Sequence, residues 1–83
     1  MEKIVTKLIA ENQVMIFTKD YCPFSTKTKA FLNSKSITFF HVDMDLIPDG
    51  AAMQKALKSL SGINILPLIY VSTQLVGGFE ELQ

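Results

Sequence analysis

The sequence predicts an α/β fold in which helices cover both faces of a four-stranded mixed sheet. Short apolar runs of strand length alternate with segments whose apolar residues recur at helical spacing. The first two predicted strands are separated by a helix, and a right-handed crossover makes such strands parallel neighbours. The last two are separated by almost no residues, which requires an antiparallel hairpin.

The first half of the chain contains two predicted helix–strand pairs. Residues 2–11 are predicted to form an amphipathic helix, because their apolar residues recur at helical spacing. The continuous apolar run at 13–18 is typical of a buried central strand. Residues 23–35 are predicted to form a helix that begins at Pro23, where a missing N–H costs nothing. The run SITFFHV at 36–42 predicts the second strand.

The second half predicts a helix, a hairpin and the start of a last helix. The helix covers about 50–60 and is expected to stop at Gly62, because glycine is preferred after a helix end. The hairpin strands are predicted at 67–72 and 74–78. Residues 79–83 are predicted to begin another helix, since acidic residues near a helix start are favoured by its dipole.

The composition predicts one small globular domain over residues 1–83. The chain is 48% apolar and carries eight basic and eight acidic residues. Nucleic-acid and membrane-surface partners require a basic excess, so neither is expected. No apolar run approaches the roughly 20 residues that a membrane span requires. One cysteine makes no internal disulfide, and the N-terminus lacks a signal-peptide pattern, so we expect a reducing, cytoplasmic location.

The stretch TKDYCPFSTKTK holds Cys22 at a predicted strand-to-helix junction. There the sulfur faces unpaired N–H groups and the positive end of the helix dipole, which lower a thiol pKa from about 8.5 into the range of about 3.5 to 7.5. Lys19, Lys27 and Lys29 add positive potential, and Asp20 opposes it. A lone cysteine is commonly a buried, inert residue, but this position favours a nucleophile that attacks disulfides.

Three segments together resemble the glutaredoxin family. KDYCPFS resembles its K-x-Y-C-P-Y-C active-site segment, LSGINILPLIYV its L-T-G-x-x-T-V-P stretch, and LVGGFEEL its I-G-G-x-x-D-L stretch. Their order and separations agree with the family and span most of the chain. The resemblance implies a thioredoxin-like fold and a cis bond before Pro67.

The chain also departs from the family pattern. Ser25 stands at the position of the absent resolving cysteine, either naturally or as an engineered Cys→Ser change. The last helix, which continues in family members, is expected to be truncated. Four other positions carry residues unusual for the family: Ile65, Leu66, Phe79 and Glu80.

The resemblance implies a glutathione-dependent thiol–disulfide oxidoreductase that acts by a monothiol mechanism. Cys22 would be its catalytic residue, glutathione its co-substrate, and glutathionylated proteins or small disulfides its substrates, with the protein a monomer. Each step would be thiol–disulfide exchange through a mixed disulfide. Ser25 resolves no mixed disulfide, because its hydroxyl is not a nucleophile toward sulfur at neutral pH.

The resemblance also implies a glutathione site. Lys19 and Gln54 would hold the glycine carboxylate, and the Leu66 backbone would pair with the cysteinyl segment. The Phe79 N–H and the Glu80 side chain would hold the γ-glutamyl end. For Gln54 a solvated helix face is the alternative, and for Glu80 an ordinary helix-start acid. The expected glutathione-binding residues are Lys19, Tyr21, Phe24, Gln54, Leu66, Pro67, Gly78, Phe79 and Glu80.

The alternative function is binding and transfer of a glutathione-ligated 2Fe-2S cluster by a dimer. Monothiol glutaredoxins hold such a cluster with the active-site cysteine of each subunit and two glutathione thiolates, and Cys22 would then be the metal ligand. Four thiolates are the usual ligand count. Ser25 favours this function by removing a competing thiol. Pro23 and the short Lys19–Cys22 spacing favour the exchange enzyme, and no other metal site is expected.

Overall fold

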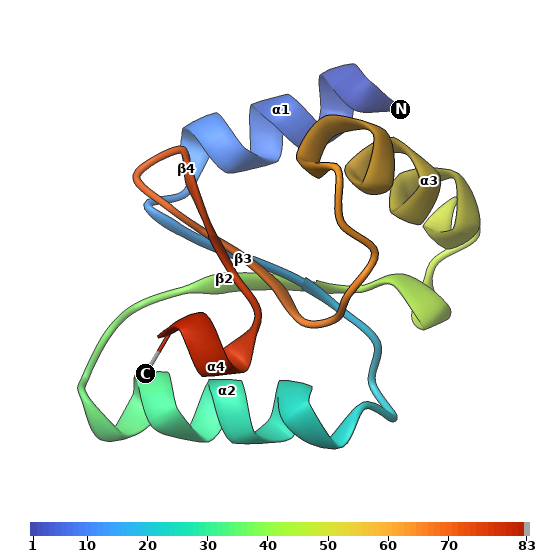
Figure 1. Cartoon of the computed structure of the whole chain (residues 1–83). Coiled ribbons are helices and arrows are strands. Elements are labelled where there is room, and N and C mark those ends of the chain that lie inside the picture. Colours follow the sequence, from blue (N-terminus) through green and yellow to red (C-terminus); the bar gives the residue numbers. More distant parts are fainter. Residues whose placement is uncertain (83) are drawn as a thin grey trace.

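The computed structural model describes residues 1–82 and contains one four-stranded sheet, in the order β2-β1-β3-β4. Strand β1 runs parallel to β2 and antiparallel to β3, and β3 and β4 form an antiparallel hairpin. Helices α1 and α3 cover one face of the sheet, and α2 and α4 cover the other (Figure 1). The predicted fold class is confirmed. In chain order the elements are α1 (Glu2–Glu11), β1 (Val14–Thr18), α2 (Pro23–Ser34), β2 (Phe40–Asp43), the 3₁₀ turn η1 (Met44–Leu46), α3 (Gly50–Ser61), β3 (Leu68–Val71), β4 (Gln74–Gly77) and α4 (Phe79–Leu82).

The central strand β1 supplies side chains to two separate cores, and all five of its residues are buried. Successive side chains of a strand point to opposite faces. Met15 and Phe17 therefore enter the larger core, with residues of α1 and α3, whereas Val14 and Ile16 enter the smaller core, with Leu32 of α2. Coverage on both faces is why this strand is a continuous apolar run, and the predicted buried strand is confirmed.

The strand predicted at 36–42 was wrong over its first half, because β2 begins only at Phe40. Helix α2 closes instead with a Schellman motif, in which the Ile37 N–H donates to the Leu32 carbonyl at 3.0 Å. Ser36 takes the left-handed conformation this motif requires, with φ of 58°. Ser36 and Ile37 therefore belong to the end of α2, although the β-branched and aromatic residues of this segment had predicted a strand from residue 36.

Glycine is the first residue of helix α3 and also its C-cap residue, for two different reasons. A Cβ at Gly50 would clash with the backbone carbonyl of Met44, so the packing of η1 against the helix start leaves no room for a side chain. At the other end Gly62 adopts the left-handed conformation, with φ of 78°, and its N–H donates to the Lys58 carbonyl. The predicted stop at Gly62 is confirmed.

The β3–β4 hairpin turns through Ser72 and Thr73, which have φ of 49° and 68°. Two successive positive φ values define a type I′ turn, in which Asn-Gly is the usual pair. Helix α4 follows the hairpin, and the predicted continuation of that helix to Gln83 lies outside the described residues. No helix within residues 1–82 is long and apolar enough to cross a membrane.

Candidate active site

Cys22 is the N-cap residue of α2, with extended backbone angles. Its carbonyl accepts hydrogen bonds from the N–H groups of Ser25 at 3.1 Å and Thr26 at 3.4 Å, so the chain turns directly from Cys22 into the helix. Pro23 occupies the first helical position. The Cys22 side chain makes no capping hydrogen bond as a neutral thiol, which leaves the N–H groups of the first turn facing the sulfur.

The loop that carries Cys22 is held from both sides. The Cys22 N–H donates to the Lys19 carbonyl at 3.1 Å. The Asp20 N–H donates to Oδ1 of Asp45, in η1, at 2.8 Å. Asp45 thus ties the loop to a segment 25 residues away. This restraint reduces the freedom of the segment that positions the thiol.

The pKa of the Cys22 thiol lies below the ordinary value. Burial raises it, but the Ser25 hydroxyl and the backbone N–H groups of Ser25 and Phe24 together lower it by more. These N–H groups belong to the second and third helical positions, the donors that an N-cap side chain normally receives. An ionised sulfur therefore takes the place of the usual N-cap oxygen, and the cysteine can exist as a thiolate nucleophile.

The three lysines around the thiol have different neighbours. Lys29 points toward β2, where Nζ lies 3.4 Å from the Asp43 carboxylate. Lys27 lies over the Phe24 ring, at 5.4 Å from its centroid. Lys19 lies over the Tyr21 ring at 5.9 Å, so its charge stays beside the loop that carries Cys22.

Pro67 places backbone groups opposite the cysteine. The Leu66–Pro67 peptide bond is cis, as expected from the resemblance. Sγ of Cys22 lies 3.9 Å from the Leu66 carbonyl oxygen, although the two residues are 44 positions apart in sequence. The start of α2 and the segment before β3 therefore meet at the sulfur.

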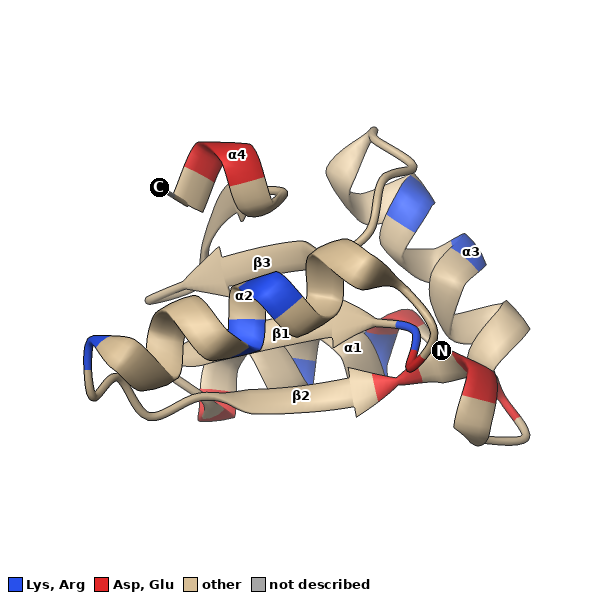
Figure 2. Ribbon diagram, turned by 90° about the horizontal axis from the view of Figure 1, so that it is seen from below, with Lys and Arg blue, Asp and Glu red and all other residues tan. Residues whose placement is uncertain are grey.

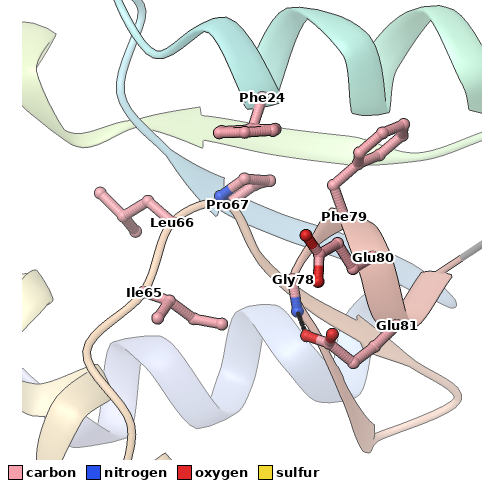
Figure 3. Close-up of a pocket in the computed structure, with 8 residues that line it drawn as sticks. All are labelled: Phe24, Ile65, Leu66, Pro67, Gly78, Phe79, Glu80 and Glu81. Atoms are coloured by element: carbon pink, nitrogen blue, oxygen red, sulfur yellow. Dashed lines mark hydrogen bonds between the residues drawn. The ribbon is translucent and has the colours of Figure 1, made fainter.

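A cavity of about 230 Å³ lies beside this meeting point (Figure 3). Six of the nine expected glutathione-binding residues line it. The other three, Lys19, Tyr21 and Gln54, do not, although Tyr21 is 72% exposed. Ile65 and Glu81 line it without having been expected. The lining residues are Phe24, Ile65, Leu66, Pro67, Gly78, Phe79, Glu80 and Glu81.

The start of α4 forms one wall of the cavity. The Gly78 N–H donates to Oε1 of Glu81 at 2.8 Å, which is the reciprocal bond of a capping box (Figure 3). Gly77 has φ of 120°, and a Cβ there would lie 2.9 Å from Oε1 of Glu81. The Glu80 carboxylate points into the cavity in the same view. Glycine followed three residues later by glutamate is the sequence signal that could have identified Glu81.

The side chain and the backbone of Phe79 have different roles. Its ring packs edge-on against Phe31 of α2, with the centroids 6.3 Å apart, and points away from the cavity. This contact joins the two helices on that face of the sheet. Only the Phe79 backbone is left to serve a ligand. Among residues 1–82 no three His, Cys, Asp or Glu side chains gather as a metal site.

A cysteine at a helix start, facing a cis-proline on a mixed sheet of this order, defines a thioredoxin-like protein. The chain belongs to the glutaredoxin family, whose family model matches residues 14–76. Members of this family are oxidoreductases with a glutathione-related redox function.

Two curated relatives illustrate the match. Glutaredoxin-1 of Rhizophagus irregularis is 37% identical over 78 residues, which cover 94% of this chain and 77% of that protein. Monothiol glutaredoxin-S6 of Oryza sativa is 34% identical over 77 residues, covering 93% of this chain and 59% of that protein.

Solved structures show the same fold. The holo form of glutaredoxin C1 from Populus tremula x tremuloides superposes with a TM-score of 0.94 at 25% identity, covering 98% of this chain and 80% of that one. The buckwheat glutaredoxin–glutathione complex superposes with a TM-score of 0.94 at 22% identity, covering 96% and 73%.

Proposed function

We propose that the chain is a glutathione-dependent thiol–disulfide oxidoreductase that removes glutathione from mixed disulfides through Cys22 alone. The observation that carries this proposal is the position of the thiol. It belongs to the N-cap residue of α2, has a lowered pKa and lies 3.9 Å from the Leu66 carbonyl oxygen beside a cavity. The buckwheat relative, solved in complex with glutathione, supports the choice of ligand.

The reaction consists of two exchanges at one sulfur. In the first, the Cys22 thiolate attacks the glutathione sulfur of a glutathionylated substrate. A bond forms between Sγ and that sulfur, the substrate disulfide breaks, and the substrate leaves as a thiolate that takes up a proton. In the second, a glutathione thiolate attacks the same glutathione sulfur. Oxidised glutathione leaves, and the electron pair of the broken bond returns to Cys22.

The cavity supports a binding mode for the γ-glutamyl end of glutathione. Its walls carry the carboxylates of Glu80 and Glu81 and include no lysine, arginine or histidine. We assign the ammonium of glutathione to the Glu80 side and its carboxylate to the Phe79 N–H. Glu81 already accepts the Gly78 N–H, so the two acids have separate tasks.

Of the remaining contacts, those of Leu66 and Phe24 belong to residues that line the cavity, whereas Lys19, Tyr21 and Gln54 do not line it. Leu66 would pair its backbone with the cysteinyl segment, as a strand-like capture of a peptide. Lys19, beside the Tyr21 ring, would receive the glycine carboxylate, with Gln54 of α3 in support. Phe24 and Tyr21 would flank the groove, and both are exposed.

Steady-state kinetics with a glutathione mixed disulfide of a small thiol test the proposal. We expect a ping-pong pattern in which both substrates saturate. Cys22→Ser should reduce the rate to that of free glutathione, because no other residue of the chain is a cysteine. Wild-type turnover no faster than free glutathione would refute the proposal.

Binding of a 2Fe-2S cluster is the second candidate, and the serine at position 25 favours it by removing a competing thiol. One chain supplies one of the four thiolates that such a cluster usually takes. Two copies and two glutathione molecules would supply the set. Purification without air in the presence of glutathione separates the candidates: cluster binding predicts a brown dimer, and the exchange enzyme alone predicts a colourless monomer.

A further inference from the structure

Ser25 carries a buried hydroxyl without a hydrogen-bond partner. The residue is 1% exposed, and its Oγ is the one buried side-chain oxygen or nitrogen in residues 1–82 that lacks a partner. An unpaired buried donor costs free energy. A buried serine hydroxyl without a partner therefore points to an acceptor that the neutral protein does not present.

Helix geometry places that hydroxyl against the thiol. Cys22 is the N-cap and Ser25 is the third helical residue, and in a capping box the side chain at each of these positions bonds to the backbone N–H of the other. The Ser25 N–H already donates to the Cys22 carbonyl at 3.1 Å. Residues three positions apart are neighbours on a helix surface, so the unpaired hydroxyl lies on the same side of the helix start as the reactive sulfur.

Thr28, one turn further along α2, shows the normal arrangement. It is also fully buried, but its hydroxyl donates to the Phe24 carbonyl at 2.8 Å. The equivalent carbonyl for Ser25 belongs to Tyr21, which precedes the helix. Thr28 therefore has a helical carbonyl four residues earlier that its hydroxyl can bond, whereas Ser25, near the start of the helix, does not.

We propose that the Ser25 hydroxyl donates a hydrogen bond to the Cys22 sulfur whenever that sulfur is a thiolate. A neutral thiol is a weak acceptor, whereas an anion is a strong one, so the hydroxyl is satisfied only in the ionised state. The same hydroxyl is among the groups that lower the Cys22 pKa. The residue at the position of a resolving cysteine therefore stabilises the thiolate without attacking it.

The bond would act in both exchanges, and in this respect the inference rests on the proposed function. In the first exchange it raises the fraction of Cys22 present as thiolate. In the second it stabilises the electron pair that returns to Sγ as oxidised glutathione leaves, because a thiol of lower pKa leaves faster. Ser25 would thus favour release as well as attack.

Alkylation of Cys22 by iodoacetamide, followed from about pH 5 to about pH 10, tests the inference without glutathione. Ser25→Ala should move the rate profile to higher pH and slow alkylation about tenfold at the acidic end, since hydrogen bonds to charged groups are the stronger ones. Ser25→Thr retains a hydroxyl and should restore much of the wild-type profile.

Thr28→Val is the matched control, because it removes a buried hydroxyl from the same helix that is already paired. Its profile should coincide with that of the wild type. A Ser25→Ala profile that coincides with the wild type, or equal shifts in Ser25→Ala and Thr28→Val, would overturn the inference. Far-ultraviolet circular dichroism of each variant checks the fold.

The experiment separates this inference from the proposed function. A shifted Ser25→Ala profile in a protein that does not turn over a glutathione mixed disulfide supports the inference and refutes the function. An unshifted profile in an active protein refutes the inference alone.

Discussion

Two helix starts border the candidate site, and they satisfy their unpaired N–H groups in opposite ways. At α2 the N-cap is Cys22, whose neutral side chain makes no capping hydrogen bond, and the first turn holds no acid. At α4 the chain closes its own start, because Glu81 accepts the Gly78 N–H. Figure 2 shows acidic residues on α4 and lysines along α2. The start of α2, which we call the open start, leaves its N–H groups to lower the pKa of the Cys22 thiol. The start of α4, which we call the closed start, is capped by Glu81 and lines the cavity.

Gly77→Ala should have the largest effect, because it disturbs the closed start. The residue has φ of 120°, and a Cβ would press on the Glu81 side chain. We expect a loss of about 1–3 kcal/mol in the free energy of unfolding, measured by urea denaturation, together with weaker glutathione binding.

Gly62→Ala is the control for that change. Gly62 also has a positive φ, of 78°, but a Cβ there would meet no atom within 4 Å. We expect a smaller loss of stability and unchanged glutathione binding. Equal effects of the two substitutions would show that the Glu81 contact is irrelevant.

Lys19→Ala tests the side of the site at the start of α2, where Lys19 is proposed to bind the glycine carboxylate of glutathione. We expect a rise of about three- to tenfold in the KM for glutathione with the fold retained, because one exposed charge contact is lost. Lys35→Ala, at the far end of α2, is the control and should leave this KM unchanged. Similar KM values for the two variants would argue against the role of Lys19.

Glu81→Gln and Glu80→Gln separate the two carboxylates of α4. Glu81→Gln should lower the free energy of unfolding by up to about 1 kcal/mol, because it weakens a charged bond at a helix start. Glu80→Gln should change stability by less than about 0.5 kcal/mol but raise the KM for glutathione. Urea denaturation and kinetics on both variants measure this, and the reverse pattern would refute the assignment.

The smallest expected effect is a pH dependence of stability that originates at Cys22. Its folded pKa is lowered, so the native thiol binds fewer protons than the unfolded one between the two pKa values. The free energy of unfolding should therefore rise with pH between the folded and the unfolded pKa. The stability that the thiol contributes is lost as the pH falls through the folded pKa. Cys22→Ala should lack this rise, and a rise of equal size in that variant would assign it to other groups.

Tyr70 sets the alkaline limit of the pH range in which the effect of Cys22 on stability can be measured. Burial raises the pKa of its phenol, so the native state holds this proton longer than the unfolded chain does. Stability should decline as pH passes the ordinary tyrosine value of about 10. Measurements between neutral pH and that value isolate the contribution of the thiol.

Local patterns were enough to predict the sheet and most helix bounds. The continuous apolar run of β1 required coverage on both faces, and the short gap between β3 and β4 required a hairpin. The first half of the strand predicted at 36–42 failed, because Ser36 adopts a left-handed conformation that only the closing hydrogen bonds of α2 explain. Short-range preference is weak where a helix end and a strand compete for the same residues.

By itself the sequence determined that one thiol stands at a helix start, since the apolar run of β1, Cys22 and Pro23 follow one another along the chain. Only the tertiary structure decided which distant groups approach that thiol and whether the Ser25 hydroxyl beside it is buried. The approach of Leu66 to Cys22, the bond from Asp20 to Asp45, and the unpaired hydroxyl of Ser25 in the packed interior depend on chain segments meeting in space. Helix and strand periodicity is a property of neighbouring residues, whereas burial and hydrogen bonding are set by residues distant in the sequence.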